Sequence, residues 1–163
     1  NRMRVYCAQN SPFTLMYDSW KAGSRELVPI TPEESRGKAE VILAKVLSNR
    51  KPPYSLAGGL FDVLKESNGD FYKVSNDQIV YWMLQFFNKE GYDILPAAAC
   101  AVAALKNALE DGVVKRDETV MLNITGAGML NATSKGFEMK KPDLILSTDL
   151  SAEEVIASVD RLF

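Results

Sequence analysis

The sequence contains no histidine, and this absence removes several kinds of chemistry at once. Ser-His-Asp and Cys-His catalysis need an imidazole, as do the zinc sites built on histidine ligands. Only two cysteines are present, Cys7 and Cys100, and they lie far apart without partners at metal-ligand spacing. Because both stand among apolar residues, we expect buried structural thiols. The sequence therefore predicts no metal site.

The chain also lacks an excess of charge of either sign and a long apolar run. With 19 basic and 21 acidic residues its net charge is −2, which gives no electrostatic reason to bind nucleic acid. No apolar run approaches the roughly 20 residues of a membrane helix, and the first residues, NRMRV, lack a signal-peptide core. We therefore expect a cytoplasmic protein without nucleic-acid or membrane partners. A length of 163 residues, 47% of them hydrophobic, fits a single α/β domain over residues 1–163.

Strand-like and helix-like segments alternate along the chain, which predicts an α/β fold with three layers, a mostly parallel sheet flanked by helices on both faces. Strands are expected at 3–8, 71–74, 119–124 and 144–147. Helices are expected at 11–21, 31–47, 60–65, 76–90, 97–109 and from 152 to the end. Residues 48–55 and 132–142 are expected to be the most mobile.

Three helices begin with a capping-box pattern, at Thr31, Ser75 and Ser151. Two of them carry an apolar face at helical spacing, which predicts that this face is buried. The residues concerned are Ile79, Trp82, Met83 and Phe86 in one helix and Val155, Ile156, Val159 and Leu162 in the other.

The expected strand 119–124 leads into Thr125-Gly126-Ala127-Gly128. Ligands of open parallel sheets bind at the carboxyl ends of the strands, which is where this turn would lie. The glycines permit a tight turn and close backbone approach, and Thr125 offers a hydroxyl that donates or accepts. A loop that only turns a buried strand would use the same glycines.

Three segments in a fixed order resemble the C-terminal half of the threonine synthase-like enzymes, which are fold-type II enzymes dependent on pyridoxal phosphate. They are residues 90–99 (EGYDILPAAA), the helix 101–112, and residues 120–128 (VMLNITGAG). The resemblance extends upstream to 4–9 and thus covers most of residues 4–130. It implies pyridoxal 5'-phosphate as cofactor and the fold of the tryptophan synthase β kind.

Within that family the chain is most similar to the cysteate synthases. The similar stretches are 49–54 (NRKPPY), 57–62 (AGGLFD), 93–96 (DILP) and 122–126 (LNITG). Threonine synthases usually have an Ala-Ile-Arg-Ile-Gly-like stretch at 56–60 and a Glu at position 95, where this chain has Leu95. The resemblance implies the replacement of the phosphate of O-phospho-L-serine by sulfite, giving L-cysteate for coenzyme M synthesis in archaea.

The same resemblance implies roles for four residues at the cofactor. Thr125 would meet the pyridine nitrogen through its hydroxyl, with Gly126 beside it in the turn, and Gly58 and Gly59 would pass near the ring. A hydroxyl does not stabilise a pyridinium as a carboxylate would, which suits β-replacement. Asn123 is expected to have a structural role.

The family's Schiff-base lysine and phosphate-binding loop would lie upstream of residue 1. The lysines of this chain read as solvated helix or turn residues, among them Lys21, Lys38, Lys65, Lys106 and Lys115. The chain is thus expected to be the C-terminal part of a longer enzyme, a homo-oligomer when whole. By itself it is expected to have no catalytic residue and no turnover.

Two alternatives stay open. One is threonine synthase or another fold-type II lyase of the same family. The other is a non-catalytic α/β module in which residues 125–128 hold a phosphate or nucleotide.

Overall fold

The computed structural model describes residues 3–136 and 141–162. The chain divides into two units, Asn1–Asn131 and Ala132–Phe163, which are considered separately below. The expectation of one domain over the whole chain therefore stays a prediction. Residues 137–140, in the middle of the segment expected to be mobile, lie outside the described residues.

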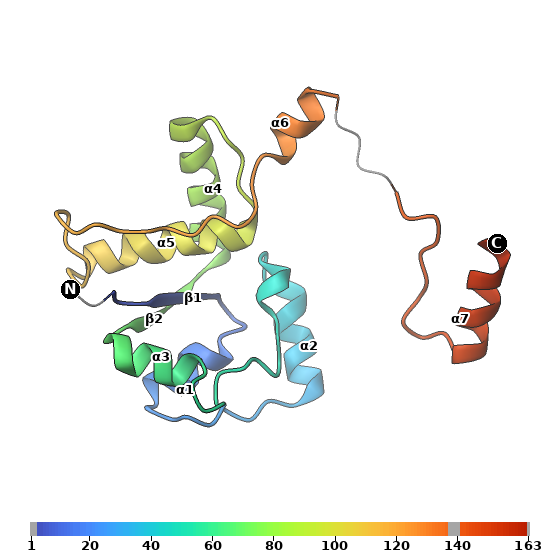
Figure 1. Ribbon diagram of the computed structural model, residues 1–163, viewed down its shortest axis with the longest axis horizontal. Coiled ribbons are helices and arrows are strands. Elements are labelled where there is room, and N and C mark those ends of the chain that lie inside the picture. The colour runs from blue at the N-terminus through green and yellow to red at the C-terminus, as the bar shows by residue number, and fades with distance from the viewer. Residues whose placement is uncertain (1–2, 137–140, 163) are drawn as a thin grey trace. The chain divides into compact units, whose positions relative to one another are not determined.

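The first unit is built on two parallel strands, β1 (Tyr6–Asn10) and β2 (Asp70–Val74). Tyr6 stands opposite Asp70 and Asn10 opposite Val74. Parallel strands need a long crossover, and here it carries helices α1 (Leu15–Lys21), α2 (Pro32–Val41) and α3 (Leu60–Ser67) with the short 3-10 helix η1 (Lys45–Leu47). Figure 1 shows these elements in blue to green.

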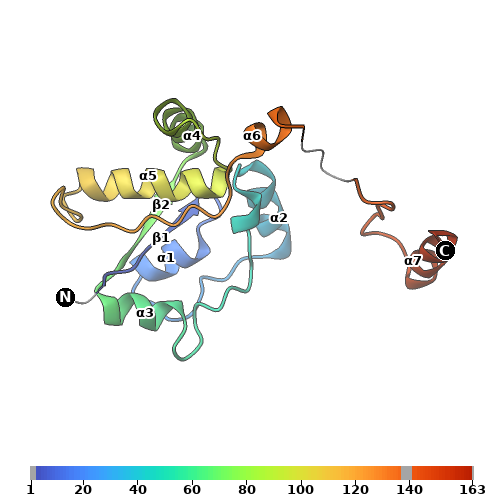
Figure 2. The same cartoon turned by 45° about the horizontal axis from the view of Figure 1, so that its top comes forward.

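Helices cover both faces of the two strands, as Figures 1 and 2 show. Helix α5 (Pro96–Glu110) packs on one face of both strands, and α1 packs on the other. The buried residues of α5 are small, with five alanines and Cys100, so the helix lies close to the sheet. This arrangement confirms the predicted α/β class with a parallel sheet between helical layers.

Helix α4 (Asn76–Glu90) confirms the capping box at Ser75 and the end of the helix at Gly91, which is left-handed. Ile79 is fully buried, and Trp82, Met83 and Phe86 pack against the same core cluster, as their spacing predicts. In the second unit, α7 (Ala152–Val159) begins at the predicted capping box of Ser151. Ile156 is 60% exposed, so the described residues of this unit do not themselves bury the apolar face, and the expected packing of that face on the core stays a prediction.

Two side-chain amides end α2 earlier than predicted, at Val41 rather than near residue 47. The Leu43 N–H donates to Asn76 Oδ1 at 3.1 Å, and the buried Ala44 N–H donates to Asn10 Oδ1 at 3.0 Å. Asn76 Nδ2 donates in turn to the Val41 carbonyl oxygen at 2.8 Å. These contacts draw the backbone out of the helix, because they offer it partners other than the helical carbonyls.

The predicted strands at 119–124 and 144–147 are absent, and both predictions are wrong for the described residues. A strand needs a neighbouring backbone to bond to, and the sheet of the described residues holds only β1 and β2. In both views the chain after α5 instead runs back along that helix (Figures 1 and 2). Met121 is 83% exposed, whereas Ile124 packs on the core cluster.

Part of the segment expected to be mobile, 132–142, is ordered as helix α6 (Met129–Ser134). Among the described residues, no helix is long and apolar enough to cross a membrane.

Candidate functional site at the turn of residues 125–128

The turn of residues 125–128 is held against the start of α5 by backbone contacts. Leu95 N–H donates to the Gly126 carbonyl oxygen at 2.8 Å, and Gly128 N–H donates to the Asp93 carbonyl oxygen at 2.8 Å. Between them, Ile94 and Ala127 form an isolated antiparallel bridge. Because these bonds connect the turn to residues immediately before a long packed helix, they fix its position within the first unit.

The two glycines of the turn meet different constraints. A Cβ atom added to Gly126 would lie 2.7 Å from Leu95 Cδ1, so a larger residue would push on that side chain. Gly128 has a φ of +80°, a conformation that residues with a side chain rarely adopt. The predicted tight turn is present at these glycines, and the close approach of its backbone to a ligand stays a prediction.

Asp93 anchors the turn through its side chain as well as its backbone. Its Oδ2 accepts a hydrogen bond from Leu130 N–H at 3.1 Å, just after the turn. Its Oδ1 is buried and has no hydrogen-bond partner in the described part of the chain. Sequence reasoning gave Asp93 no role of its own, although it belongs to the stretch 93–96 (DILP) that resembles the cysteate synthases. The structure identifies it as a residue that positions the turn.

Thr125 itself is exposed, and within residues 3–136 and 141–162 its hydroxyl makes no hydrogen bond. A hydroxyl that is accessible and unengaged, on a turn held by several hydrogen bonds, fits the group expected opposite a pyridine nitrogen. Asn123 is also exposed, on the segment leading into the turn.

Gly58 and Gly59 lie in a different place, at the start of α3. Helix α3 packs beside α1, since the rings of Phe61 and Trp20 are 5.7 Å apart, whereas the turn of residues 125–128 lies at the start of α5 on the other face of the sheet. A Cβ atom on Gly59 would lie 2.6 Å from the Pro53 carbonyl oxygen, so the backbone packing by itself requires glycine at this position. In the described residues no hydrogen bond joins this loop to the turn.

Asp62 holds the same loop together. Its Oδ2 accepts from Gly58 N–H at 2.8 Å and from Arg25 Nη1 at 3.0 Å, and its Oδ1 accepts from Arg25 Nη2. The hydrogen bond from Arg25 and the one from Gly58 lower the pKa of Asp62. The Arg25 guanidinium also lies over the Phe61 ring. These contacts give Gly58 and Gly59 a structural reason, and their cofactor role stays a prediction.

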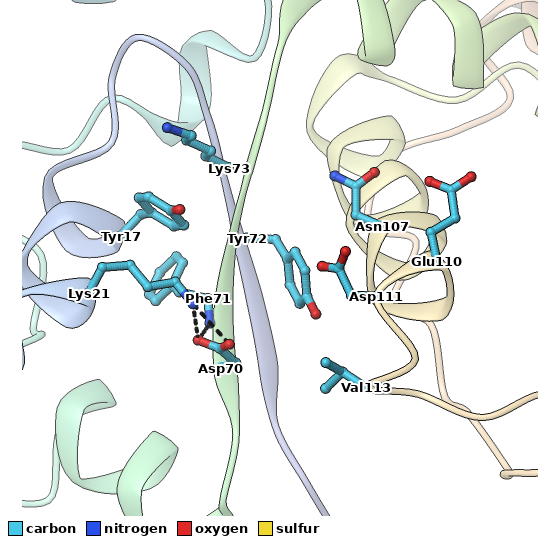
Figure 3. Close-up of a pocket in the computed structure, with 10 residues that line it drawn as sticks. All are labelled: Tyr17, Lys21, Asp70, Phe71, Tyr72, Lys73, Asn107, Glu110, Asp111 and Val113. Carbon is cyan, nitrogen blue, oxygen red and sulfur yellow. Dashed lines mark hydrogen bonds and ion pairs between the residues drawn. The ribbon is translucent and has the colours of Figure 1, made fainter.

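A cavity of about 300 Å³ lies beside β2, between α1 and the end of α5 (Figure 3). Its charged groups are already paired in part, since Lys21 Nζ donates to both oxygens of Asp70 at 2.7 and 2.9 Å. Burial opposes ionisation of Asp70, but hydrogen bonds from Lys21, Phe71 N–H and Trp20 outweigh it and lower its pKa. Burial raises the pKa of Tyr72 to about 12. None of the residues predicted for the cofactor lines this cavity.

Three of the lysines considered in the sequence, Lys21, Lys65 and Lys106, contact residues outside the turn of residues 125–128. Besides Lys21, Lys106 Nζ lies 2.6 Å from Glu110 Oε1, and Lys65 Nζ lies 5.0 Å from the centre of the Phe61 ring. These contacts agree with the prediction that they belong to helix surfaces.

The surroundings of the two thiols disfavour their ionisation. Burial raises the pKa of Cys7 to about 11 and that of Cys100 to about 12, so both stay protonated near neutral pH. Cys100 is buried in α5 and Cys7 half-buried in β1, and both are free. The predicted structural role fits these surroundings.

Comparison with known proteins places the chain in a family. A family model described as pyridoxal-phosphate dependent enzyme matches residues 1–126. The chain is 45% identical over 127 residues to a cysteate synthase of Methanocella paludicola, which covers 77% of this chain and 30% of that enzyme. It is 37% identical over 155 residues to that of Methanosarcina mazei (93% and 37%) and 36% identical over 162 residues to that of Methanothrix thermoacetophila (98% and 38%).

The chain thus spans about a third of the length of the curated relatives it matches. Pyridoxal phosphate is the cofactor named by the matching family model. The match over residues 1–126 includes both strands, α5 and the beginning of the turn at Thr125 and Gly126. On this match, the chain belongs to the family of pyridoxal-phosphate dependent enzymes.

Proposed function

We propose that this chain is the C-terminal part of a cysteate synthase. The whole enzyme would replace the phosphate of O-phospho-L-serine by sulfite: the bond from the β-carbon to the phosphate oxygen breaks, a carbon–sulfur bond forms, and L-cysteate and phosphate leave. The observation that carries the proposal is the similarity to cysteate synthases, which reaches 98% of this chain. A cytoplasmic homo-oligomer, taking part in coenzyme M synthesis, belongs to the same proposal.

When bound, pyridoxal phosphate supplies the electron sink that β-replacement needs. The part played by this chain is to present one hydroxyl to the pyridine nitrogen, from Thr125, with the backbone of Gly126 beside it. Asp93 and Leu95 hold that hydroxyl in place through the bonds to Gly126, Gly128 and Leu130. The Schiff-base lysine and the phosphate loop would come from the remainder of the enzyme, so the chain alone would not turn over substrate.

An assay of the longer protein with pyridoxal phosphate, O-phosphoserine and sulfite tests the reaction. Cysteate together with released phosphate, and no threonine from phosphohomoserine, is the expected result. Threonine as product would establish the alternative within the family. If no product formed and no cofactor absorbance developed, the remaining reading would be a phosphate- or nucleotide-binding module.

Substitution of Thr125 by Val tests the position of the cofactor. We expect T125V to fold normally in the longer protein while shifting the absorbance and fluorescence of the bound cofactor, because the hydroxyl partner of the ring nitrogen is lost. T119V, on the exposed segment before the turn, is the matched control and should leave the spectra unchanged. Unaltered spectra and rates in T125V would remove Thr125 from the site.

A further inference from the structure

Helix α4 carries apolar side chains on two faces, and the described residues of the first unit bury only one of them. The buried face packs against the core cluster through Ile79 and Trp82, and the helix lies beside α5 in both views (Figures 1 and 2). The other face presents Val80, Leu84 and Phe87, which are 54%, 50% and 47% exposed. Their spacing of four and three residues places them in one row along the helix, called the α4 stripe below.

The α4 stripe has the character of a contact surface. Tyr81 lies exposed beside it, with its ring packed edge-on against Trp82 at 5.2 Å, and the stripe itself contains no charged residue. Single apolar side chains are common on protein surfaces, whereas a contiguous group of them marks a contact with another surface. The helix is 15 residues long, begins at the capping box of Ser75 and ends at Gly91, so it presents the stripe on a defined support.

The stripe is complementary in shape to a second copy of itself. When two α4 helices pack antiparallel about a two-fold axis, each residue faces the one that lies equally far on the other side of the axis. With the axis beside Leu84, the small side chain of Val80 would face the large one of Phe87 from the other copy. The two Leu84 side chains would meet between these pairs. Small residues opposite large ones fill the space between two helices without voids.

The polar residues at the border of the stripe also fit a second copy. Asp77 and Asn88 are exposed and lie about three turns apart, which puts them on the same side of the stripe. A two-fold axis keeps that side together, so each Asp77 carboxylate would face the Asn88 amide of the other copy. Because a carboxylate accepts hydrogen bonds and an amide donates them, this pairing would fix the register. The two copies of Glu90, near the other border, would lie at opposite ends of the pair.

We propose that α4 forms an interface between two copies of the whole enzyme, which pair antiparallel about a two-fold axis beside Leu84. The inference rests on the homo-oligomer of the proposed function and names its contact surface, and it makes no use of the reaction or of the cofactor. The α4 stripe would form the apolar centre of the contact, and Asp77 and Asn88 its polar border.

The molar mass of the longer protein, measured by light scattering after size-exclusion chromatography, tests this interface. We expect an oligomer whose mass is halved in L84K, because the substitution brings two ammonium groups together at the apolar centre of the contact. The dissociation constant of the pair should rise on the order of a hundredfold or more. V46K is the matched control, since Val46 is exposed on η1, outside the stripe, and this variant should keep the unaltered mass.

Disulfide cross-linking distinguishes a second copy from any other occupant of the stripe. In L84C the two thiols would lie beside the axis, so oxidation should join two copies. In V80C the thiols would be roughly 10 Å apart along the helices, too far for a disulfide. The unaltered protein, whose free cysteines are Cys7 in β1 and Cys100 in α5, gives the background.

A monomeric longer protein, an unchanged mass in L84K, or an L84C cross-link that is absent or forms equally in V80C would overturn the proposal. If L84K failed to fold and L84C gave no cross-link, the stripe would be covered by another part of the longer protein, which also overturns it. These measurements do not involve cysteate. A longer protein that forms cysteate yet stays monomeric would therefore refute the interface and leave the proposed reaction standing.

Discussion

The side chain missing from Gly126 lets the turn of residues 125–128 lie directly against Leu95. The Leu95 N–H bond to the Gly126 carbonyl oxygen, at 2.8 Å, brings the two residues together, and a Cβ atom at position 126 would meet Leu95 Cδ1 at 2.7 Å. Leu95 is 44% exposed, so its side chain has room to move. The size of the side chain at position 126 is therefore limited by Leu95, and a smaller residue at position 95 would relieve this limit.

We expect G126A to destabilise the protein by about 1 kcal/mol, because the added methyl group displaces Leu95. When G126A is introduced into the L95A variant, it should lower the free energy of unfolding by much less, since the obstructing side chain is gone. Urea denaturation of the single and double variants measures this coupling. As a control, G37A adds a methyl group where nothing lies within 4 Å, inside α2, and should stabilise the helix by about 0.5–1 kcal/mol. Additive effects of L95A and G126A would show that the clash does not occur.

At the scale of secondary-structure elements, Asn10 connects the end of β1 to three other segments. Its Nδ2 donates to the carbonyl oxygens of Ser11 and Val74 and to Asn76 Oδ1, and its Oδ1 accepts from Ala44 N–H. The residue is fully buried. One side chain thus joins the carboxyl ends of both strands, the start of α4 and the segment that ends α2.

N10A should cost about 2–4 kcal/mol of unfolding free energy, because it leaves the buried Ala44 N–H without a partner and removes one of the two hydrogen bonds that the Val74 carbonyl oxygen accepts. Chemical denaturation followed by circular dichroism measures the loss. N88A, at an exposed position near the end of α4, removes the same group and should change stability by less than about 0.5 kcal/mol. A loss in N10A no larger than in N88A would mean that Asn10 does not hold these elements together.

The elements that could be predicted from sequence are those specified by nearby residues. The capping boxes at Thr31, Ser75 and Ser151 each set the start of a helix from four adjacent residues, and all three are present. The end of α2 depends on Asn10, which is 34 residues away from Ala44, and no local pattern signals such a contact. Propensity alone likewise could not settle the segment 119–124, because a strand exists only where a neighbouring backbone is available.

The candidate site likewise contains residues that could be predicted from the sequence and residues that could not. The turn and Thr125 could be predicted because two glycines close together in the sequence are typical of a tight turn. Asp93 could not, since its carboxylate acts on Leu130, whose N–H lies 37 residues along the chain. Gly58 and Gly59 were predicted as cofactor residues from the family resemblance. The structure shows that Gly59 is also required by its packing against Pro53, and the sequence by itself does not distinguish such a structural requirement from a functional one.

At the scale of the whole molecule, the chain spans about a third of its curated relatives, and the sheet of its described residues has two strands. The segment 119–124 is rich in residues that favour strands yet pairs with no strand of the part of the chain that the structure describes, and Val120 and Met121 are 46% and 83% exposed. If the chain is part of a longer enzyme, as proposed, the segment would have a partner strand there. Pairing would place Thr125 at the end of a strand, where ligands of parallel sheets bind.

Hydrogen–deuterium exchange of the longer protein tests this pairing. We expect the amides of 119–124 to be strongly protected, by a factor comparable with those of β1, because ladder hydrogen bonds must open before exchange. The charged turn at 115–117 is the internal control and should exchange rapidly, since its side chains are exposed. Slow exchange in both segments would point to general burial instead of pairing. Rapid exchange at 119–124 would show that the segment stays unpaired in the longer protein as well, and that Thr125 is presented by the bonds to Asp93 and Leu95 alone.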